Sequence, residues 1–299
     1  MVSSVENVLG GLLPHLESAG IIMRVDEDMI STTDLVLLPV FGNWLFCQRP
    51  QKKPYMYFGD DSIALLLRTT PQRYGRCLDL CSGVGLQALH CSMFSQEVCM
   101  VELNPFCCDL ARINILMNAV EDRIEVFCGD LYEPVKGKSF ETIVANPPLV
   151  PFPRQTTYPY VGHGGEDGLS VTWRILEDLP VFLTVRGTAR IIGTLLGDGI
   201  LPIEVKRIEQ WCSRAGMDVL LTVVNQHQIS PGTELFSSLV ESAALTEAGR
   251  RNAALAFREM LERNSATHLC SCFFLVRHGS GILQFQDFSR QRTTGFWYA

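Results

Sequence analysis

Apolar residues fall into two alternating patterns from residue 76 onward. Short continuous apolar runs are typical of buried strands, whereas apolar residues three and four positions apart are typical of helices. Runs of the first kind predict seven strands, at Cys77–Cys81, Val98–Leu103, Ile124–Cys128, Phe140–Ala145, Ala189–Leu196, Val219–Val224 and Leu269–Val276. Strands that alternate with helices predict an α/β fold with a Rossmann-like, doubly wound, mainly parallel sheet and right-handed crossovers.

Helices are predicted between these strands at Gly85–Phe94, from Pro105 onward, at Ser170–Phe182 and at Pro202–Ala215. The second of them has a clear start, because Asn104 is a preferred N-cap residue and Pro105 suits the first helical position. The spacing of its apolar residues predicts a buried face made of Phe106, Leu110, Ile113 and Met117. A further helix is predicted from Ile63, and Asp60 and Asp61 before it would cap that helix or face a pocket.

The first 57 residues predict a small N-terminal α+β module, ahead of a main domain over residues 58–299. A helical apolar stripe over residues 4–19 is followed by two strand-like runs, Ile21–Val25 and Leu35–Cys47. A helix followed by short strands is compatible with a winged-helix-like unit. We expect this module to serve as a structural cap or a homodimer contact rather than as a substrate-binding unit.

Composition narrows the class of protein. The chain has 299 residues, of which 47% are hydrophobic and 19% charged, so it is long and apolar enough to bury a large core. The net charge of −7 weighs against a protein that binds naked nucleic acid, without excluding a local basic patch. The 11 cysteines form no C-x-x-C pair, which favours reduced thiols over disulfides or a metal site. No apolar run approaches the roughly 20 residues needed to span a bilayer, and we expect a soluble, cytoplasmic protein without a membrane partner.

A glycine-rich loop follows the first strand of the predicted sheet. In the run from Asp79 to Gly85, glycines allow the backbone to approach a ligand and aim amide groups at it. The spacing of Gly83, Gly85 and Ala88 also satisfies the dinucleotide fingerprint, and Glu102 stands where that fingerprint expects a ribose-binding acid. The loop alone therefore leaves a nicotinamide dinucleotide and other nucleotides open.

Acidic residues at neighbouring strand ends separate these ligands. Asp79 lies four residues before Gly83, and a carboxylate there repels a pyrophosphate but attracts a cationic group. Glu102 ends the second strand, and Asp130 follows the third strand, where it could accept a hydrogen bond from an amino group such as that of adenine. Three acids suit a zwitterionic nucleoside without phosphates. We therefore favour S-adenosylmethionine over a nicotinamide cofactor.

The fourth predicted strand ends in Asn146-Pro147-Pro148-Leu149. Two prolines exclude a helix and remove two backbone donors, so the strand must end there. A residue before proline is held in extended geometry, which would present the Asn146 side chain beyond the sheet. Its amide offers one acceptor and two donors, and could hold a planar amide or amino nitrogen.

Together these motifs resemble those of the class I S-adenosylmethionine-dependent methyltransferases. Within that class, Asn146-Pro147-Pro148 and the stretch Gly164–Leu169 are similar to the branch of release-factor glutamine methyltransferases and related small-domain N-methyltransferases. The resemblance implies that Asp79, Gly83 and Gly85 hold the methionine end, Glu102 the ribose hydroxyls and Asp130 the adenine. It further implies cofactor contacts for Cys81, Leu103, Leu131 and Asn146.

The resemblance also implies the chemistry, which is N-methylation of a planar amide or amino nitrogen on a protein glutamine or a small metabolite. Asn146 would accept from the N–H of the acceptor, beside a backbone carbonyl held by Pro147 and Pro148, and would stabilise positive charge on that nitrogen. A base of RNA or DNA is the alternative acceptor, and a nicotinamide-dependent oxidoreductase is the alternative from another class.

The sequence departs from the family after the prolines, where Leu149 replaces an aromatic residue that could stack on a planar acceptor. Phe152, or Tyr158 and Tyr160 in the following loop, are the candidates to replace it. His163 is a further candidate for substrate binding, as a general base or as an ordinary polar loop residue.

The long helical stretch Thr233–Arg263, with a break near Thr246, lies between the last two predicted strands. The family fold needs only a hairpin at this point, so residues 233–263 are expected to be an insertion at the sheet edge, away from the cofactor loops. Such an insertion could also fold back as a lid.

Overall fold

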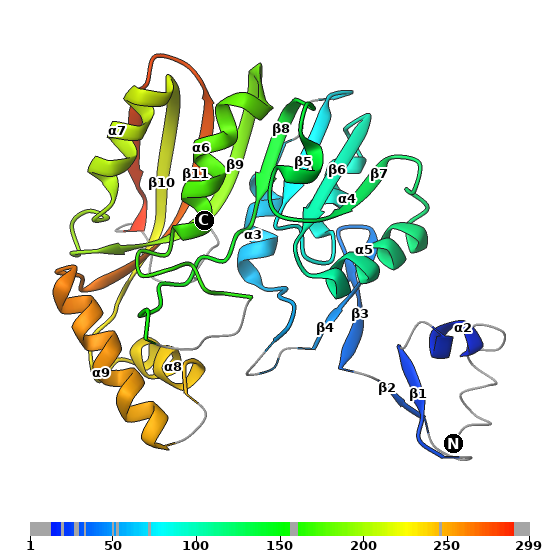
Figure 1. Cartoon of the computed structure of the whole chain (residues 1–299), viewed down its shortest axis with the longest axis horizontal. Coiled ribbons are helices and arrows are strands. Elements are labelled where there is room, and N and C mark those ends of the chain that lie inside the picture. Colours follow the sequence, from blue (N-terminus) through cyan, green and yellow to red (C-terminus); the bar gives the residue numbers. More distant parts are fainter. Residues whose placement is uncertain are drawn as a thin grey trace.

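The computed structural model describes residues 13–18, 21–26, 30–32, 34–49, 51, 54–70, 73–155, 161–244 and 247–289. Its centre is an eight-stranded sheet in the order β12-β10-β11-β9-β8-β5-β6-β7 (Figure 1). The strands are β5 (Arg76–Leu80), β6 (Glu97–Glu102), β7 (Ile124–Cys128), β8 (Phe140–Ala145), β9 (Leu183–Gly197), β10 (Met217–Gln228), β11 (His268–His278) and β12 (Leu283–Asp287). The expected fold class is confirmed.

The strand directions follow from the connections. The neighbouring strands β7, β6, β5, β8 and β9 pair in parallel. An α-helix follows each of β5, β6 and β8, and a one-turn 3-10 helix lies between β7 and β8. Strand β11 pairs antiparallel with both β9 and β10. The sheet has one strand more than the seven expected, because β12 adds in parallel to β10 at the edge. Its sequence, Leu283-Gln284-Phe285-Gln286-Asp287, alternates apolar and polar residues rather than forming an apolar run, as an edge strand with a partly exposed face requires.

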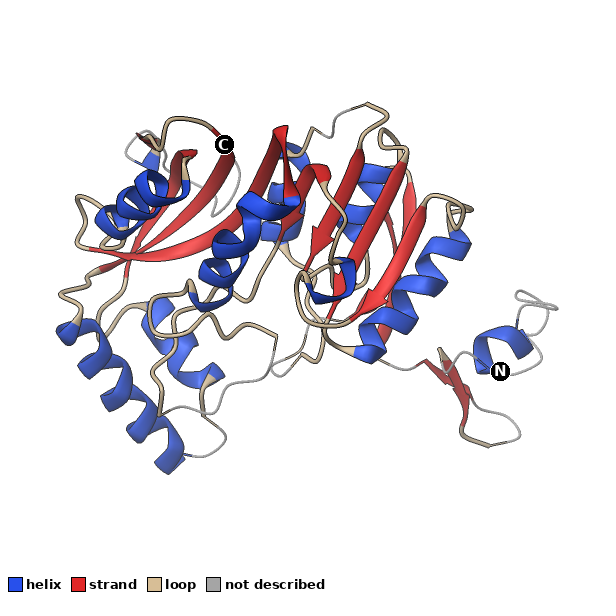
Figure 2. Cartoon of the chain, turned by 45° about the horizontal axis from the view of Figure 1, so that its top comes forward, coloured by secondary structure: helices blue, strands red, loops and turns tan. Residues whose placement is uncertain are grey.

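Helices cover both faces of the sheet (Figure 2). They are α3 (Asp60–Arg68), α4 (Leu86–Ser92), α5 (Pro105–Met117), α6 (Ser170–Phe182) and α7 (Val205–Ala215). Successive residues of a strand point to opposite faces. Met100 accordingly packs in one hydrophobic cluster with Leu110 of α5, and Val101 packs in another with Leu176 of α6. This is the two-sided burial expected of a parallel sheet. No described helix is long and apolar enough to cross a membrane.

The N-terminal part contains two separate strand pairs. Short helix α2 (Leu13–Ser18) precedes strands β1 (Ile22–Arg24) and β2 (Ile30–Thr32), which pair with each other. A second hairpin follows, and it lies between this pair and the central sheet (Figure 1). That hairpin consists of β3 (Leu35–Val40) and β4 (Asn43–Gln48), so the predicted run Leu35–Cys47 is two strands. The chain turns at Phe41 and Gly42, both with positive φ, as a tight hairpin turn requires. Residues 4–12 of the predicted first helix lie outside the described residues.

Helix α5 buries the middle of the predicted face, where Leu110 is buried and Ile113 packs against the same cluster, but not its two ends. Phe106 and Met117 are 49% and 37% exposed, and the buried positions are Cys107, Cys108, Leu110, Ala111, Asn114 and Ile115. The reason is Asn114, which is fully buried against β4. Its Oδ1 accepts from the Phe46 N–H at 2.7 Å, and its Nδ2 donates to the carbonyls of Phe46 and Val84. The helix face therefore follows a polar contact with the hairpin.

The insertion forms two helices, α8 (Glu234–Ser242) and α9 (Glu247–Arg263), which lie together at the end of the sheet where β10 ends and β11 begins (Figure 1). Phe236 of α8 and Phe257 of α9 pack edge to face, with ring centroids 6.3 Å apart. They share a hydrophobic cluster with Phe152 and Leu269. The position of the predicted break, Thr246, lies outside the described residues.

We expect Asn114→Ala to lower the free energy of unfolding by about 3 kcal/mol, because the buried N–H and C=O of Phe46 and the C=O of Val84 would lose their partner. Asn118 bonds to the backbone of Trp44 in the same manner at an exposed site, so Asn118→Ala is the matched control and should cost about 1 kcal/mol. Urea unfolding measures both. Equal losses for the two variants would contradict this role of Asn114.

Candidate active site

A cavity of about 870 Å³ opens beyond the carboxyl ends of β5, β6 and β8. The strand order reverses between β5 and β8, where crossovers leave the sheet in opposite directions. Ligands of open α/β sheets bind at such a switch point. Of the predicted site residues, the cavity is lined by Asp79, Cys81, Gly83, Glu102, Leu103, Asp130, Leu131, Asn146, Pro147, Pro148, Leu149 and His163. The fold thus brings most of the predicted site together.

The loop after β5 needs an unusual backbone. Cys81, Gly83 and Gly85 all have positive φ, at 55°, 55° and 91°. Gly83 borders the cavity, where a ligand can approach its backbone. Gly85 does not line the cavity. It lies behind the loop at the start of α4, and a Cβ there would stand 3.4 Å from the sulfur of Met100.

Glu102 ties two loops of the site together. Its Oε2 accepts from the Gly83 N–H at 2.8 Å, and its Oε1 accepts from the Asn104 N–H at 2.8 Å. The side chain is half-buried and lines the cavity. Each carboxylate oxygen has a further lone pair, so the group could also accept from two hydroxyls of a ligand.

Three buried acceptors near the loop have no partner among the described residues. Asp79 is fully buried, and only its Oδ2 is bonded, to the Ala88 N–H at 3.0 Å. Its Oδ1, Ser82 Oγ and Gln87 Oε1 are buried, unpaired and on residues that line the cavity. Burial holds the pKa of Asp79 well above its ordinary value.

An arriving ammonium would satisfy these acceptors, and the methionine end of S-adenosylmethionine carries one. The residues present therefore fit that cofactor. Neither Ser82 nor Gln87 was predicted as a site residue. Ser82 lies inside the glycine-rich loop, but nothing in the sequence of α4 distinguishes Gln87 as a ligand-binding residue.

Asp130 lies on the far side of Glu102 and forms an ion pair. Its Oδ2 is 2.7 Å from a guanidinium nitrogen of Arg174, at the start of α6, and both residues line the cavity. Leu103, which is exposed, and Leu131, which is buried, flank this region. Arg174 was not predicted, because its partner is distant in sequence. The pair gives this end of the cavity both an acceptor and a donor.

Asn146 is held in place by the start of α3. Its Nδ2 donates to Ser62 Oγ at 3.1 Å, and Ser62 Oγ donates to Asp61 Oδ1 at 3.3 Å. Among the described residues, only the amide nitrogen of Asn146 takes part in a hydrogen bond, so Oδ1 is available to a ligand. Asp61 is buried and also lines the cavity, as one of its two expected roles required.

The side of the cavity beyond Asn146 is mainly aliphatic. Leu149 is only 8% exposed and packs against Leu65 and Ile192. Phe152, one of the candidates to replace the missing aromatic residue, is fully buried and does not line the cavity. Tyr158 and Tyr160 lie outside the described residues.

His163 lines the cavity on this side. Its Nδ1 accepts from the Gly165 N–H at 3.1 Å, so that nitrogen is not free to act as a base.

Helix α8 closes the same side of the cavity. Leu235 and Leu239 line it together with Leu269 of β11. Of the two placements expected for the insertion, at the sheet edge or folded back as a lid, its contact with the cavity fits the second better. Arg263 of α9 lies 2.8 Å from Glu166 in the loop that carries His163, which links the insertion to that loop.

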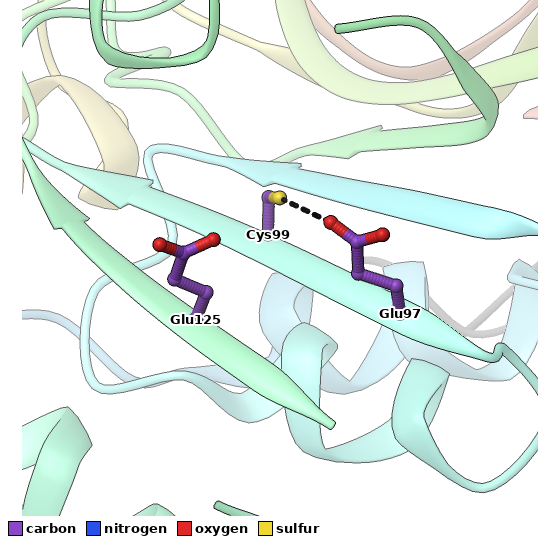
Figure 3. A group of neighbouring side chains, drawn as sticks. All are labelled: Glu97, Cys99 and Glu125. Atoms are coloured by element: carbon purple, nitrogen blue, oxygen red, sulfur yellow. Dashed lines mark hydrogen bonds between the residues drawn. The ribbon is translucent and has the colours of Figure 1, made fainter. Parts of the chain in front are cut away.

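A group of possible metal ligands lies outside the cavity, on β6 and β7 (Figure 3). Ligand atoms of Glu97, Cys99 and Glu125 are within 4.8 Å of one another. The ammonium of Lys138 lies 3.5, 3.5 and 3.1 Å from these side chains and supplies the positive charge they need. Lysine pairing accounts for this cluster.

The buried carboxyl of Asp61 is expected to make the stability of the folded protein depend on pH. Burial raises the pKa of its carboxyl to about 6, with nearby Asp60 adding to the effect. The folded state therefore favours the protonated carboxyl. The stability that protonated Asp61 contributes to the fold is lost as pH rises through about 6. We expect the free energy of unfolding of Asp61→Asn, relative to that of the wild type, to rise by about 2 kcal/mol between about pH 4.5 and about pH 8. Urea unfolding of both proteins tests this, and a constant difference between them would contradict it.

Comparison with known proteins gives a family match over the same region. The model of the methyltransferase small domain matches residues 59–194. A ribosomal protein uL3 glutamine methyltransferase of Bradyrhizobium diazoefficiens is 30% identical over 44% of this chain and 44% of its own length. A candidate protein N5-glutamine methyltransferase of Methanocaldococcus jannaschii is 30% identical over 46% of this chain and 71% of its own length. The chain thus spans less than half of the first relative and most of the second.

Solved structures resemble the chain more distantly. A candidate transferase of Pyrococcus horikoshii aligns over 92% of this chain and 86% of its own, with 12% identity and a TM-score of 0.49. M. jannaschii TYW2 in complex with AdoMet aligns over 83% and 90%, with 11% identity and a TM-score of 0.48. These values are too low to inform function. The family match, the archaeal relative and the cavity at the carboxyl ends of β5, β6 and β8 agree, and the chain belongs to the methyltransferase small-domain family.

Proposed function

We propose that this protein is an S-adenosylmethionine-dependent methyltransferase that methylates the side-chain amide nitrogen of a glutamine in another protein. The observation that carries the proposal is the Asn146 amide, which Ser62 holds by its nitrogen in the cavity that also contains Asp79 and Glu102. The relatives named as glutamine methyltransferases support a protein amide as the acceptor. A net charge of −7 disfavours a nucleic-acid acceptor.

The cofactor end is assigned from unpaired acceptors. When bound, S-adenosylmethionine supplies a methyl group on a positively charged sulfur. Asp79, Ser82 and Gln87 would hold its ammonium, Glu102 its ribose hydroxyls and Asp130 its adenine amino group. The buried carboxyl of Asp79 argues against a nicotinamide dinucleotide, because a pyrophosphate in this loop supplies no positive charge to stabilise the ionised form.

Asn146 would orient the acceptor. Its Oδ1 accepts from the acceptor N–H, while the bond from its Nδ2 to Ser62 keeps the amide from turning. Holding the nitrogen in line with the methyl group makes the displacement effectively unimolecular, which can supply several kcal/mol. The nitrogen would take the methyl group as the S–C bond breaks, with S-adenosylhomocysteine leaving and the N–H proton passing to water. The Asn146 carbonyl dipole would stabilise the positive charge that the nitrogen gains before that proton leaves.

We also propose that the chain divides into residues 1–57 and 58–299. The first part would form a homodimer contact, and the protein would be cytoplasmic. Leu37, Phe41 and Trp44 of the β3–β4 hairpin are exposed apolar residues, which supports a protein contact there.

We expect Asn146→Ala to lower methyl transfer at least about 100-fold and to leave affinity for S-adenosylhomocysteine nearly unchanged, because the interaction is made with the acceptor. The assay follows labelled methyl transfer to a panel of glutamine-containing peptides, with the same peptides carrying glutamate as blanks. Asn118→Ala is the control for an asparagine outside the cavity. Full activity of Asn146→Ala would contradict the assignment, and lost cofactor binding would move Asn146 to the cofactor end.

Glu102→Ala should weaken the binding of S-adenosylhomocysteine by about 1–3 kcal/mol, because charge-assisted hydrogen bonds to the ribose and to the Gly83 loop are removed. Glu97 begins the same strand at the opposite end, outside the cavity, so Glu97→Ala is the matched control. Calorimetric titration measures both. Equal affinity of the two variants would remove Glu102 from the cofactor site.

A further inference from the structure

His163 is fixed in the cavity by the backbone around it. The Val150 N–H donates to the Gly162 carbonyl at 2.9 Å, and the Gly164 N–H donates to the Val150 carbonyl at 2.9 Å. These bonds place His163 beside Val150, which follows Asn146 by four residues. The side chains of Asn146 and His163 thus enter one cavity from two paired segments.

The imidazole has one face supported. It stacks on Phe152, with ring centroids 5.8 Å apart and an angle of 27° between the planes. Phe152 is fully buried and packs edge to face on Phe257 of α9, at 5.4 Å. The ring of His163 is therefore held against the hydrophobic core of the insertion.

A backbone hydrogen bond fixes the proton of this ring. The Gly165 N–H donates to Nδ1 at 3.1 Å, which requires a lone pair on Nδ1. In the neutral ring the proton must then be on Nε2. On a residue that lines the cavity, the Nε2–H is then the ring donor left for a ligand.

A carboxamide acceptor needs such a donor. Its N–H groups require acceptors, as Asn146 Oδ1 provides, and its carbonyl oxygen requires an N–H or O–H partner. Leu149, Leu235 and Leu239 on this side offer aliphatic surface. The hydroxyl of Thr194 is already bonded to the Leu149 carbonyl.

We propose that His163 is a specificity-determining residue, which donates its Nε2–H to the carbonyl oxygen of the acceptor amide. This inference rests on the proposed function and deepens it. An amine acceptor would leave the Nε2–H without a partner in a mainly aliphatic pocket. A site built to bond a polar group discriminates strongly against a substrate that lacks it.

Two substitutions separate this role from a structural one. In His163→Asn, the side-chain oxygen takes the place of Nδ1, so the bond from Gly165 is kept and the donor is lost. In His163→Gln, the side-chain nitrogen takes the place of Nε2, so the donor is kept and the bond from Gly165 is lost. We expect His163→Asn to lower kcat/KM for the glutamine peptide by about tenfold to 100-fold, and His163→Gln to retain more of it. The reverse order would overturn the proposal.

A second readout does not require catalysis. Nuclear magnetic resonance of protein labelled with 15N in histidine, with S-adenosylhomocysteine bound, reports which ring nitrogen carries the proton, and His163→Asn assigns the signal. We expect the Nε2–H form, and a shift of that proton on adding acetamide but not methylamine. A proton on Nδ1, or no response to acetamide, would overturn the proposal. If no glutamine peptide is methylated, the proposed function fails, while this measurement still decides the role of His163.

Discussion

The arrangement of the site depends most on the burial of the Asp79 carboxylate. The side chain is fully buried, and within the described part of the chain only one of its oxygens has a partner, the Ala88 N–H at the start of α4. Burial disfavours the charged form, so such a group is stable only when protonated or beside a positive charge. Ser82 and Gln87 place two more unpaired acceptors nearby. A cationic ligand group would supply the donors that these acceptors lack.

The two ends of the cavity are linked through elements far apart in the sequence. Ser62 lies in the first turn of α3, and its hydroxyl accepts a hydrogen bond from Asn146, 84 residues later. The Ser62 carbonyl also accepts from Gln87 Nε2 at 2.7 Å, on the helix that follows the glycine-rich loop. Helix α3 therefore connects the residue assigned to the acceptor with one assigned to the cofactor. The hydrogen bonds from Asn146 to the Ser62 hydroxyl and from that hydroxyl to Asp61 give a physical reason for the acidic and hydroxyl residues at the start of α3.

Much of the sheet and half of the site could be predicted, because both are marked by local pattern. Parallel strands are buried on both faces and form continuous apolar runs, and the acids and Asn146 follow those runs directly. The remainder depends on contacts between distant segments. Arg174, Gln87 and the leucines of α8 have no sequence signal that places them in the cavity, and Phe152 is taken into the core by Phe257. The buried face of α5 includes Asn114, because this residue bonds to the β3–β4 hairpin, and the spacing of the apolar residues does not show that contact.

The measurement that tests the central assignment most directly is calorimetric titration with S-adenosylhomocysteine, 5′-methylthioadenosine and NAD. Methylthioadenosine keeps the nucleoside and lacks the amino-acid end that Asp79, Ser82 and Gln87 are assigned to hold. We expect S-adenosylhomocysteine to bind, methylthioadenosine to bind at least about tenfold more weakly, and NAD not to bind. Binding of NAD, or equal affinity for the two sulfur nucleosides, would contradict the assignment.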